Sequence, residues 1–282
     1  MAGNIDLKTL LKDVPDRDSI ARPAQWVLAD PGFPAAKRRF CERVANHFAS
    51  DKIMGRTITD TGSYAIFALL IASLLTGPIT VGAVVDALGR SLASERRIRR
   101  TLGSLADRGL VRIESSEEDR RQRLLSPSPL AQDFFVRWHA AYSAPLADLC
   151  VSTVLPAATL TSAAAWHVII VAMHARNGFA LTDGHPYIEA LMAQRGGYLA
   201  LVGITENPAL SPYGASQLFG RSLTQMRKMV EQARAVPVSE VDRWFATEIA
   251  FAAFVAEATK RASKAGRSGR DAKLSPLPYS SW

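Results

Sequence analysis

The sequence predicts a mainly α-helical protein with two helix-turn-helix units in tandem, extra helices at both ends and one short β hairpin. Three observations predict this fold class. Most of the 282 residues fall in stretches whose apolar positions recur at spacings of three and four, the period of a buried helix face. Only residues 110–126 have the alternation and polar tip of a β hairpin. A Gly-Arg-Ser-Leu sequence occurs at 89–92 and again at 220–223, between two short helices each time.

Composition and predicted elements divide the chain into four parts. Helical fragments interrupted by prolines make up residues 1–58, and the unit with the β hairpin follows in residues 59–150. A second helical unit covers residues 151–262, and residues 263–282 form a basic tail rich in Gly, Ser and Pro. Because 48% of all residues are hydrophobic, both units have enough apolar side chains for a buried core.

The first helix-turn-helix unit is centred on residues 80–108. Its first short helix begins at Thr80, a residue type suited to capping a helix N-terminus, and its second helix begins after Ser94. The apolar stripe of the second helix is formed by Ile98, Leu102 and Leu105. The basic residues of this helix therefore lie on its exposed face.

Arginines occupy four of the five positions 96–100, and Glu95 is the only acidic residue nearby. A single exposed arginine is usually just solvated, but a solvated helix face more often mixes acidic and basic residues. The planar guanidinium group fits guanine edges and phosphate oxygens. We therefore expect Arg96 and Arg100, which point away from the apolar stripe, to contact base edges in a DNA major groove. The flanking candidates for DNA contact are Ser94, Arg97, Arg99 and Ser104.

Residues 109–135, GLVRIESSEEDRRQRLLSPSPLAQDFF, resemble the wing and following helix of MarR-type winged helix-turn-helix transcriptional regulators. The resemblance covers about residues 65–138 and implies that a wing arginine enters the DNA minor groove, held by the adjacent aspartate. The matching wing residues are Asp119, Arg120 and Arg121, and Arg123 follows as a further DNA-contact candidate. The chain departs from the family by a longer turn at residues 90–92 and by long additions on both sides.

The second helix-turn-helix unit is predicted from an internal alignment. Residues 212–235 align with residues 81–104 without a gap, which predicts the same turn insertion in both units. The second unit is less basic, and Val236-Pro237-Val238 stands where a wing strand would begin. This unit either contacts phosphates weakly or forms an assembly surface, and we prefer weak contact. Its candidate DNA contacts are Arg221, Ser222, Gln225, Arg227 and Lys228.

Further predicted helices flank the two units. Residues 37–48 carry an apolar stripe that must pack either on its own domain or on a partner subunit. Residues 130–149 carry aromatic side chains typical of a core or a dimer seam, and Pro145 is expected to end or kink this helix. From Lys260 onwards we expect a disordered tail that adds non-specific attraction to phosphate.

The positive charge of the chain is concentrated in two segments. The formal net charge is +8, while residues 90–100 alone carry +4 and residues 260–273 carry +5. The rest of the chain is therefore close to neutral. Positive charge focused on one helix and one tail suits a phosphate-bearing partner.

The sequence contains no recognisable catalytic or cofactor-binding motif. It lacks a phosphate-binding glycine loop, a dinucleotide-binding motif, a nucleophile elbow and paired carboxylates, so we expect no enzyme and no cofactor. His167, His174, His185 and Glu189 lack the spacing of a metal site. With two cysteines, no secretory leader and apolar runs too short for a bilayer, the sequence indicates a cytoplasmic, nucleoid-associated bacterial protein.

These observations predict a sequence-specific, DNA-binding transcriptional regulator that acts as a homodimer on a two-fold operator. Its expected partners are double-stranded DNA and a second copy of the chain, not a membrane; a small-molecule effector is compatible with this function but no pocket can be named from sequence. Two other functions stay open. A replication initiator of plasmid or phage type would bind iterated DNA repeats, and a helical interaction scaffold would bind no DNA at low salt.

Overall fold

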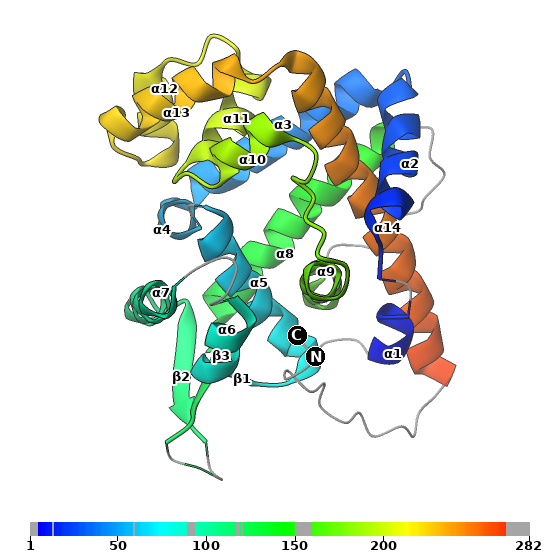
Figure 1. Cartoon of the computed structure of the whole chain (residues 1–282), viewed down its shortest axis with the longest axis vertical. Helices are drawn as coiled ribbons and strands as arrows, with labels where there is room; N and C mark the ends of the chain where they lie inside the picture. The colour runs from blue at the N-terminus through cyan, green and yellow to red at the C-terminus, as the bar shows by residue number, and fades with distance from the viewer. Residues whose placement is uncertain are drawn as a thin grey trace.

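The structure, a computed structural model, describes residues 5–12, 14–58, 60–88, 94–116, 119, 121–149 and 159–268, and is mainly helical as predicted (Figure 1). The helices of the first half are α1 (Leu7–Leu10), α2 (Arg17–Ala29), α3 (Phe33–Ser50), α4 (Lys52–Thr57), α5 (Thr61–Thr76), α6 (Val81–Leu88), α7 (Glu95–Asp107), α8 (Pro129–Ser143) and the 3-10 helix η1 (Ala144–Asp148). Those of the second half are α9 (Leu160–Asn177), α10 (Pro186–Met192), α11 (Gly197–Glu206), α12 (Pro212–Phe219), α13 (Leu223–Ala235) and α14 (Val238–Ser268).

Two apolar helices, α5 and α9, pack against each other in the interior of the molecule (Figure 1). Both are buried on nearly every side, so their N-termini need internal hydrogen-bond partners. Asp60 and Ser63 form a capping box at the start of α5, and Thr159 and Ser162 form one at the start of α9. These caps satisfy backbone N–H groups that would otherwise be buried without a partner.

The first unit consists of α5, α6, α7 and a small antiparallel sheet. Its strands β1 (Ile79–Thr80), β2 (Val111–Ser115) and β3 (Arg123–Pro127) lie in the order β1-β3-β2, with Ile113 opposite Leu125. Helix α7 buries the predicted stripe of Ile98, Leu102 and Leu105. Gly109 follows it at φ +69°, a backbone conformation that favours glycine, and turns the chain into β2.

A second unit consists of α11, α12 and α13, which pack on one another. Helices α6 and α12 both have 8 residues, and α7 and α13 both have 13. Ser222 caps α13 as Ser94 caps α7, each accepting from the backbone N–H three residues later. Helix α13 buries Met226, Val230 and Ala233, which occupy the positions of the three buried residues of α7.

The turns of the two units differ, which corrects the ungapped alignment. Helix α12 begins 131 residues after α6, but α13 begins only 128 residues after α7. Residues 220–222 separate α12 from α13, whereas residues 89–94 separate α6 from α7. The prediction that both units share the turn insertion is therefore wrong, because each second helix begins at its own serine cap. Residues 89–93 lie outside the described residues.

Three further expectations are resolved by the described residues. Helix α14 begins at Val238 and leaves no strand at 236–238, so the second unit has no wing there. The same helix continues past Lys260 to Ser268, although we expected disorder there. Ala262 is fully buried and its carbonyl accepts from the backbone N–H of Asp6, and these contacts hold this part of the helix in place. The predicted end of the aromatic helix near Pro145 is confirmed, since α8 gives way to η1 after Ser143.

The apolar surfaces for which the sequence left a dimer partner open are covered within the chain. Phe40, Val44 and Phe48 of α3 are fully buried, and α3 packs on α8, α11 and η1. At the opposite side of the molecule from α7, α2 lies along α14 (Figure 1). Among the described helices, none is both long and apolar enough to span a bilayer.

Candidate nucleic-acid interface

Helix α7 presents Arg96 and Arg100 to solvent at its N-terminal end. Within the described residues neither side chain takes part in an ion pair. Ser94 caps the helix and is exposed beside them. Two free guanidinium groups one turn apart on an exposed helix face are therefore available to an anionic or hydrogen-bonding partner.

The other two arginines of this helix have partners. The Arg97 guanidinium lies 2.6 Å from Oδ1 of Asp60, whose side chain is only 2% exposed, and this ion pair ties α7 to the N-terminus of α5. The Arg99 guanidinium pairs at 2.8 Å with Glu95, and both of these side chains are exposed. Arg97 is thus a structural contact, which differs from its expected role on phosphate. Ser104 is half-buried on the flank of the helix.

The β2–β3 hairpin extends beyond α7 (Figure 1) and carries further arginines. Arg121 and Arg123 are exposed, and the Arg123 guanidinium donates to Ser115 Oγ at 2.8 Å across the hairpin. The Asp119 carboxylate accepts from the backbone N–H of Arg121 at 2.9 Å. Asp119 therefore shapes the turn through the Arg121 backbone. Arg120 lies outside the described residues.

In the second unit, the candidate residues separate into exposed and internal ones. Arg227 and Lys228 of α13 are exposed, as is the cap residue Ser222. Gln225 donates to the carbonyl of Arg195 at 2.6 Å, next to the N-terminus of α11. Arg221 turns inward and donates to the carbonyl of Gly55 in α4, so its expected contact with DNA disagrees with its position.

Four arginines gather where the two units meet, and the sequence did not reveal this cluster. These junction arginines are Arg56, Arg108, Arg195 and Arg221. Burial, together with the positive charges of Arg195, Arg56 and Arg108, lowers the pKa of Arg221 to about 10. Arg56 donates to the carbonyl of Gly220, and Arg108 donates to Thr57. Because they come from four separate segments, no local pattern could have indicated them.

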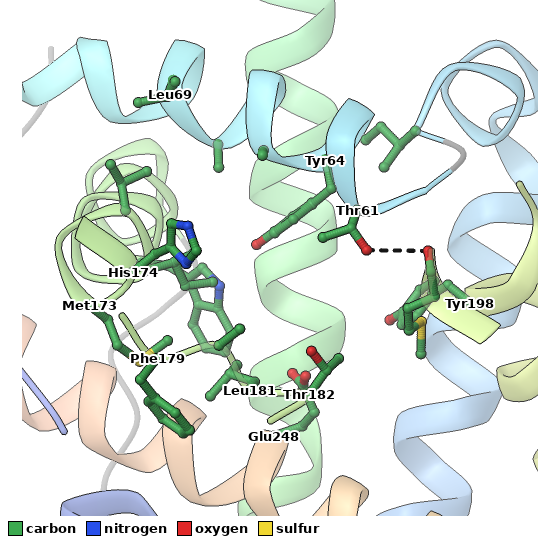
Figure 2. Close-up of a pocket in the computed structure, with 18 of the residues that line it drawn as sticks. Thr61, Tyr64, Leu69, Met173, His174, Phe179, Leu181, Thr182, Tyr198 and Glu248 are labelled. Carbon is green, nitrogen blue, oxygen red and sulfur yellow. Dashed lines mark hydrogen bonds between the residues drawn. The ribbon is translucent and has the colours of Figure 1, made fainter. Parts of the chain in front are cut away.

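A cavity of about 430 Å³ lies between helices α5 and α6 of the first unit and helices α8, α9 and α14. Its walls come from α5, α6, α8, α9, α11, α14 and the chain around Phe179. Figure 2 shows Tyr64 of α5, His174 of α9 and Glu248 of α14 directed towards this space. Asp60, the partner of Arg97, also lines the cavity, so one wall is directly connected to α7.

Glu248 is the most unusual group in the cavity. Its side chain is buried, and within the described residues it forms no ion pair. Burial raises the pKa of the Glu248 carboxyl to about 8, although the neighbouring Trp244 side chain acts against that rise. The tyrosines Tyr142 and Tyr198 share a hydrogen bond of 2.8 Å between their hydroxyls. Burial raises the pKa of both, and the nearby Glu248 charge adds to that rise.

Two of the histidines that could have suggested a metal site lie in different surroundings. His167 is buried, its Nδ1 lies 2.7 Å from the carbonyl of Ala163, and burial lowers its pKa to about 4. His174 instead lines the cavity. In the part of the chain that the structure describes, no three His, Cys, Asp or Glu side chains gather closely enough to hold a metal ion.

Comparisons with protein-family models, with curated proteins and with solved structures found no match to this chain. The similarity to MarR-type regulators consequently rests on the sequence motif alone.

The Arg97–Asp60 pair predicts a difference in stability between neighbouring arginines. Arg97→Ala leaves a buried carboxylate without its cation and should lower the free energy of unfolding by about 1–3 kcal/mol. Arg96→Ala, at an exposed position one residue earlier, should change it by less than about 0.5 kcal/mol. Urea unfolding followed by circular dichroism measures both values, and equal effects would contradict a structural role for Arg97.

Glu248 predicts a pH-dependent stability difference. Because its folded-state pKa of about 8 lies above the ordinary value of 4.5, its stabilising contribution is complete below pH 4.5 and is lost as the pH rises through 8. Glu248→Gln, a neutral isostere, should match the wild type near pH 5 and exceed its unfolding free energy by about 3–5 kcal/mol at pH 9. Thermal unfolding across this pH range measures the difference; a constant gap between the two proteins would refute it.

Proposed function

We propose that this protein is a sequence-specific, double-stranded-DNA-binding transcriptional regulator. The observation that carries the proposal is that Arg96 and Arg100 stay exposed and without ion pairs on α7, while Arg97 and Arg99 beside them are engaged within the protein. Arginine pairs at the N-terminal end of a second helix suit guanine edges in the major groove. Arg96 and Arg100 are assigned to base contact.

The elements around α7 support a winged helix-turn-helix arrangement. Helices α5, α6 and α7 are followed by the β2–β3 hairpin in the chain order of that motif, and the hairpin extends beyond α7 on the same edge of the molecule (Figure 1). In this arrangement the second helix enters the major groove and the hairpin reaches the neighbouring groove or backbone. Arg121 and Arg123 are assigned to this second contact.

The second unit is proposed to be a weaker copy of the first. The support is the pair of equal helix lengths, the matching serine caps and the matching buried positions. In this correspondence Arg227 and Lys228 take the places of Arg99 and Arg100, but Thr224 takes the place of Arg96. We assign Arg227 and Lys228 to phosphate contact without base preference.

The junction arginines support a shared DNA surface for both units. Arg56, Arg108 and Arg195 are exposed, and the charge of each acts on the half-buried Arg221. Helix α4, which carries Arg56, contacts α12 and lies between α7 and α13 along one edge (Figure 1). A duplex running along this edge would meet positive charge continuously from one unit to the other.

The effect of Arg100 on sequence preference tests the proposal. A preferred sequence is first selected from a random duplex library, and affinities for it and for unrelated DNA are then measured at one salt concentration. Arg100→Ala should weaken binding to the preferred sequence by about 1–3 kcal/mol and relax preference at one position, because one base contact is lost.

Arg22→Ala, on exposed α2 at the opposite side of the molecule, is the matched control and should leave affinity and preference unchanged. Thermal unfolding of both variants separates contact loss from misfolding. An Arg100→Ala protein that is folded and keeps its full sequence preference would disprove the assignment. The selected sites also distinguish a two-fold operator, bound by a homodimer, from the iterated repeats of a replication initiator.

The second unit yields a different expectation. The double substitution Arg227→Ala with Lys228→Ala should weaken binding to all duplexes alike and reduce the salt-dependence slope by about 2, because two phosphate contacts are lost. Affinity measured from low to moderate salt gives this slope. An unchanged slope would instead identify the second unit as an assembly surface.

A further inference from the structure

The cavity beside the first unit has the size and lining of a small-molecule site. Its volume of about 430 Å³ falls in the range of ligand pockets, and its walls are mainly apolar. Half-buried residues such as Tyr64, Ile170 and Leu181 form part of the lining. Within the described residues, the cavity is therefore not sealed by a full layer of protein.

The charged groups of the cavity wall favour a cation over an anion. No lysine or arginine is among the described residues that line it, whereas Asp60 and Glu248 both do. The Asp60 carboxylate is already paired with Arg97. Glu248 has no cationic partner in the described part of the chain, and its burial therefore disfavours the ionised carboxylate. A positively charged ligand would supply the missing counter-charge.

The aromatic side chains of the cavity are suited to the same ligand. Among the described residues, seven large aromatic rings contribute to its walls: Tyr64, Trp138, Tyr142, Trp166, Phe179, Tyr198 and Trp244. The faces of tyrosine and tryptophan rings attract organic cations, and their area is large enough to enclose an apolar body. Figure 2 shows Tyr64 and Glu248 entering the space from opposite helices. A ligand between them would meet a carboxyl group and ring faces together.

We propose that this cavity binds a hydrophobic organic cation, an amine or quaternary onium compound, with its charge near the Glu248 carboxylate and its apolar part against the aromatic rings. Binding itself depends only on the cavity. That the ligand acts as an effector of DNA binding rests on the proposed function, and follows from the walls that α5, α6 and Asp60 contribute.

Direct titration of the full chain with tetraphenylphosphonium at about pH 9, where the Glu248 carboxyl is ionised, tests the site without DNA. Calorimetry, together with quenching of the cavity tryptophans, should give saturable binding to one site. Tetraphenylborate, which has the same shape and the opposite charge, should bind at least about tenfold more weakly. Equal affinity for the two ions, or no binding of the cation, would overturn the proposal.

Two substitutions on α14 test whether the Glu248 carboxylate, and not only the apolar lining of the cavity, holds the cation. Glu248→Gln should weaken tetraphenylphosphonium binding by about tenfold or more. Glu257→Gln, the same change at a half-exposed position of α14, should leave it unaffected. An unaltered affinity in Glu248→Gln would refute the role of the carboxylate. Ala65→Phe, which fills the cavity from α5, should abolish binding, and binding that survives it would place the ligand elsewhere.

The effector role is measured separately, as the affinity of the wild type for its selected duplex with and without tetraphenylphosphonium. A change that disappears in Glu248→Gln supports the role. An affinity that does not change overturns the effector role while leaving the ligand site intact. If the protein binds no DNA at all, the proposed function fails, and the direct titration still decides whether the cavity binds the cation.

Discussion

The carboxylate of Asp60 connects the core, the arginine helix and the cavity of this protein. It caps α5, pairs with Arg97 of α7 and lines the cavity. A buried carboxylate requires such partners, because desolvation without them costs several kcal/mol. The position of α7 on the body of the molecule therefore depends on a contact that is itself inside the protein. The Arg97–Asp60 pair holds α7 against the protein, and Arg96 and Arg100 of the same helix face the solvent.

Much of the fold was predictable because it depends on short-range rules. Ser94 and Ser222 begin their helices as capping residues should, Pro145 ends α8, and the buried stripe of α7 has the expected period. The prediction of equal turns in the two units was wrong because the serine cap, and not the Gly-Arg-Ser-Leu sequence, determines where each second helix begins. Matching Gly-Arg-Ser-Leu letters placed Ser222 opposite Ser91, whereas the cap of the first unit is Ser94.

The parts that escaped prediction depend on residues far apart in the chain. Arg97 meets Asp60 across 37 residues, and Arg221 meets Gly55 across 166, so neither partner could be inferred from spacing. The cavity joins α5 and α6 to α9 and α14, and Glu248 gave no local signal in a helix that carries several other charged residues. The aromatic residues of α8 were correctly expected in the core, yet Trp138 and Tyr142 also line the cavity.

The packing of α2 along α14 has a consequence for how the chain reaches its folded state. Lys37 of α3, the helix that follows α2, forms an ion pair with Asp242 of α14, which is 205 residues away in the chain. Contacts of such sequence separation form late, because closing a long loop costs entropy before any contact repays it. During synthesis, the apolar face of α2 stays uncovered until α14 has been made. Aggregation would compete with folding during the time in which this face is exposed, and not after the fold is complete.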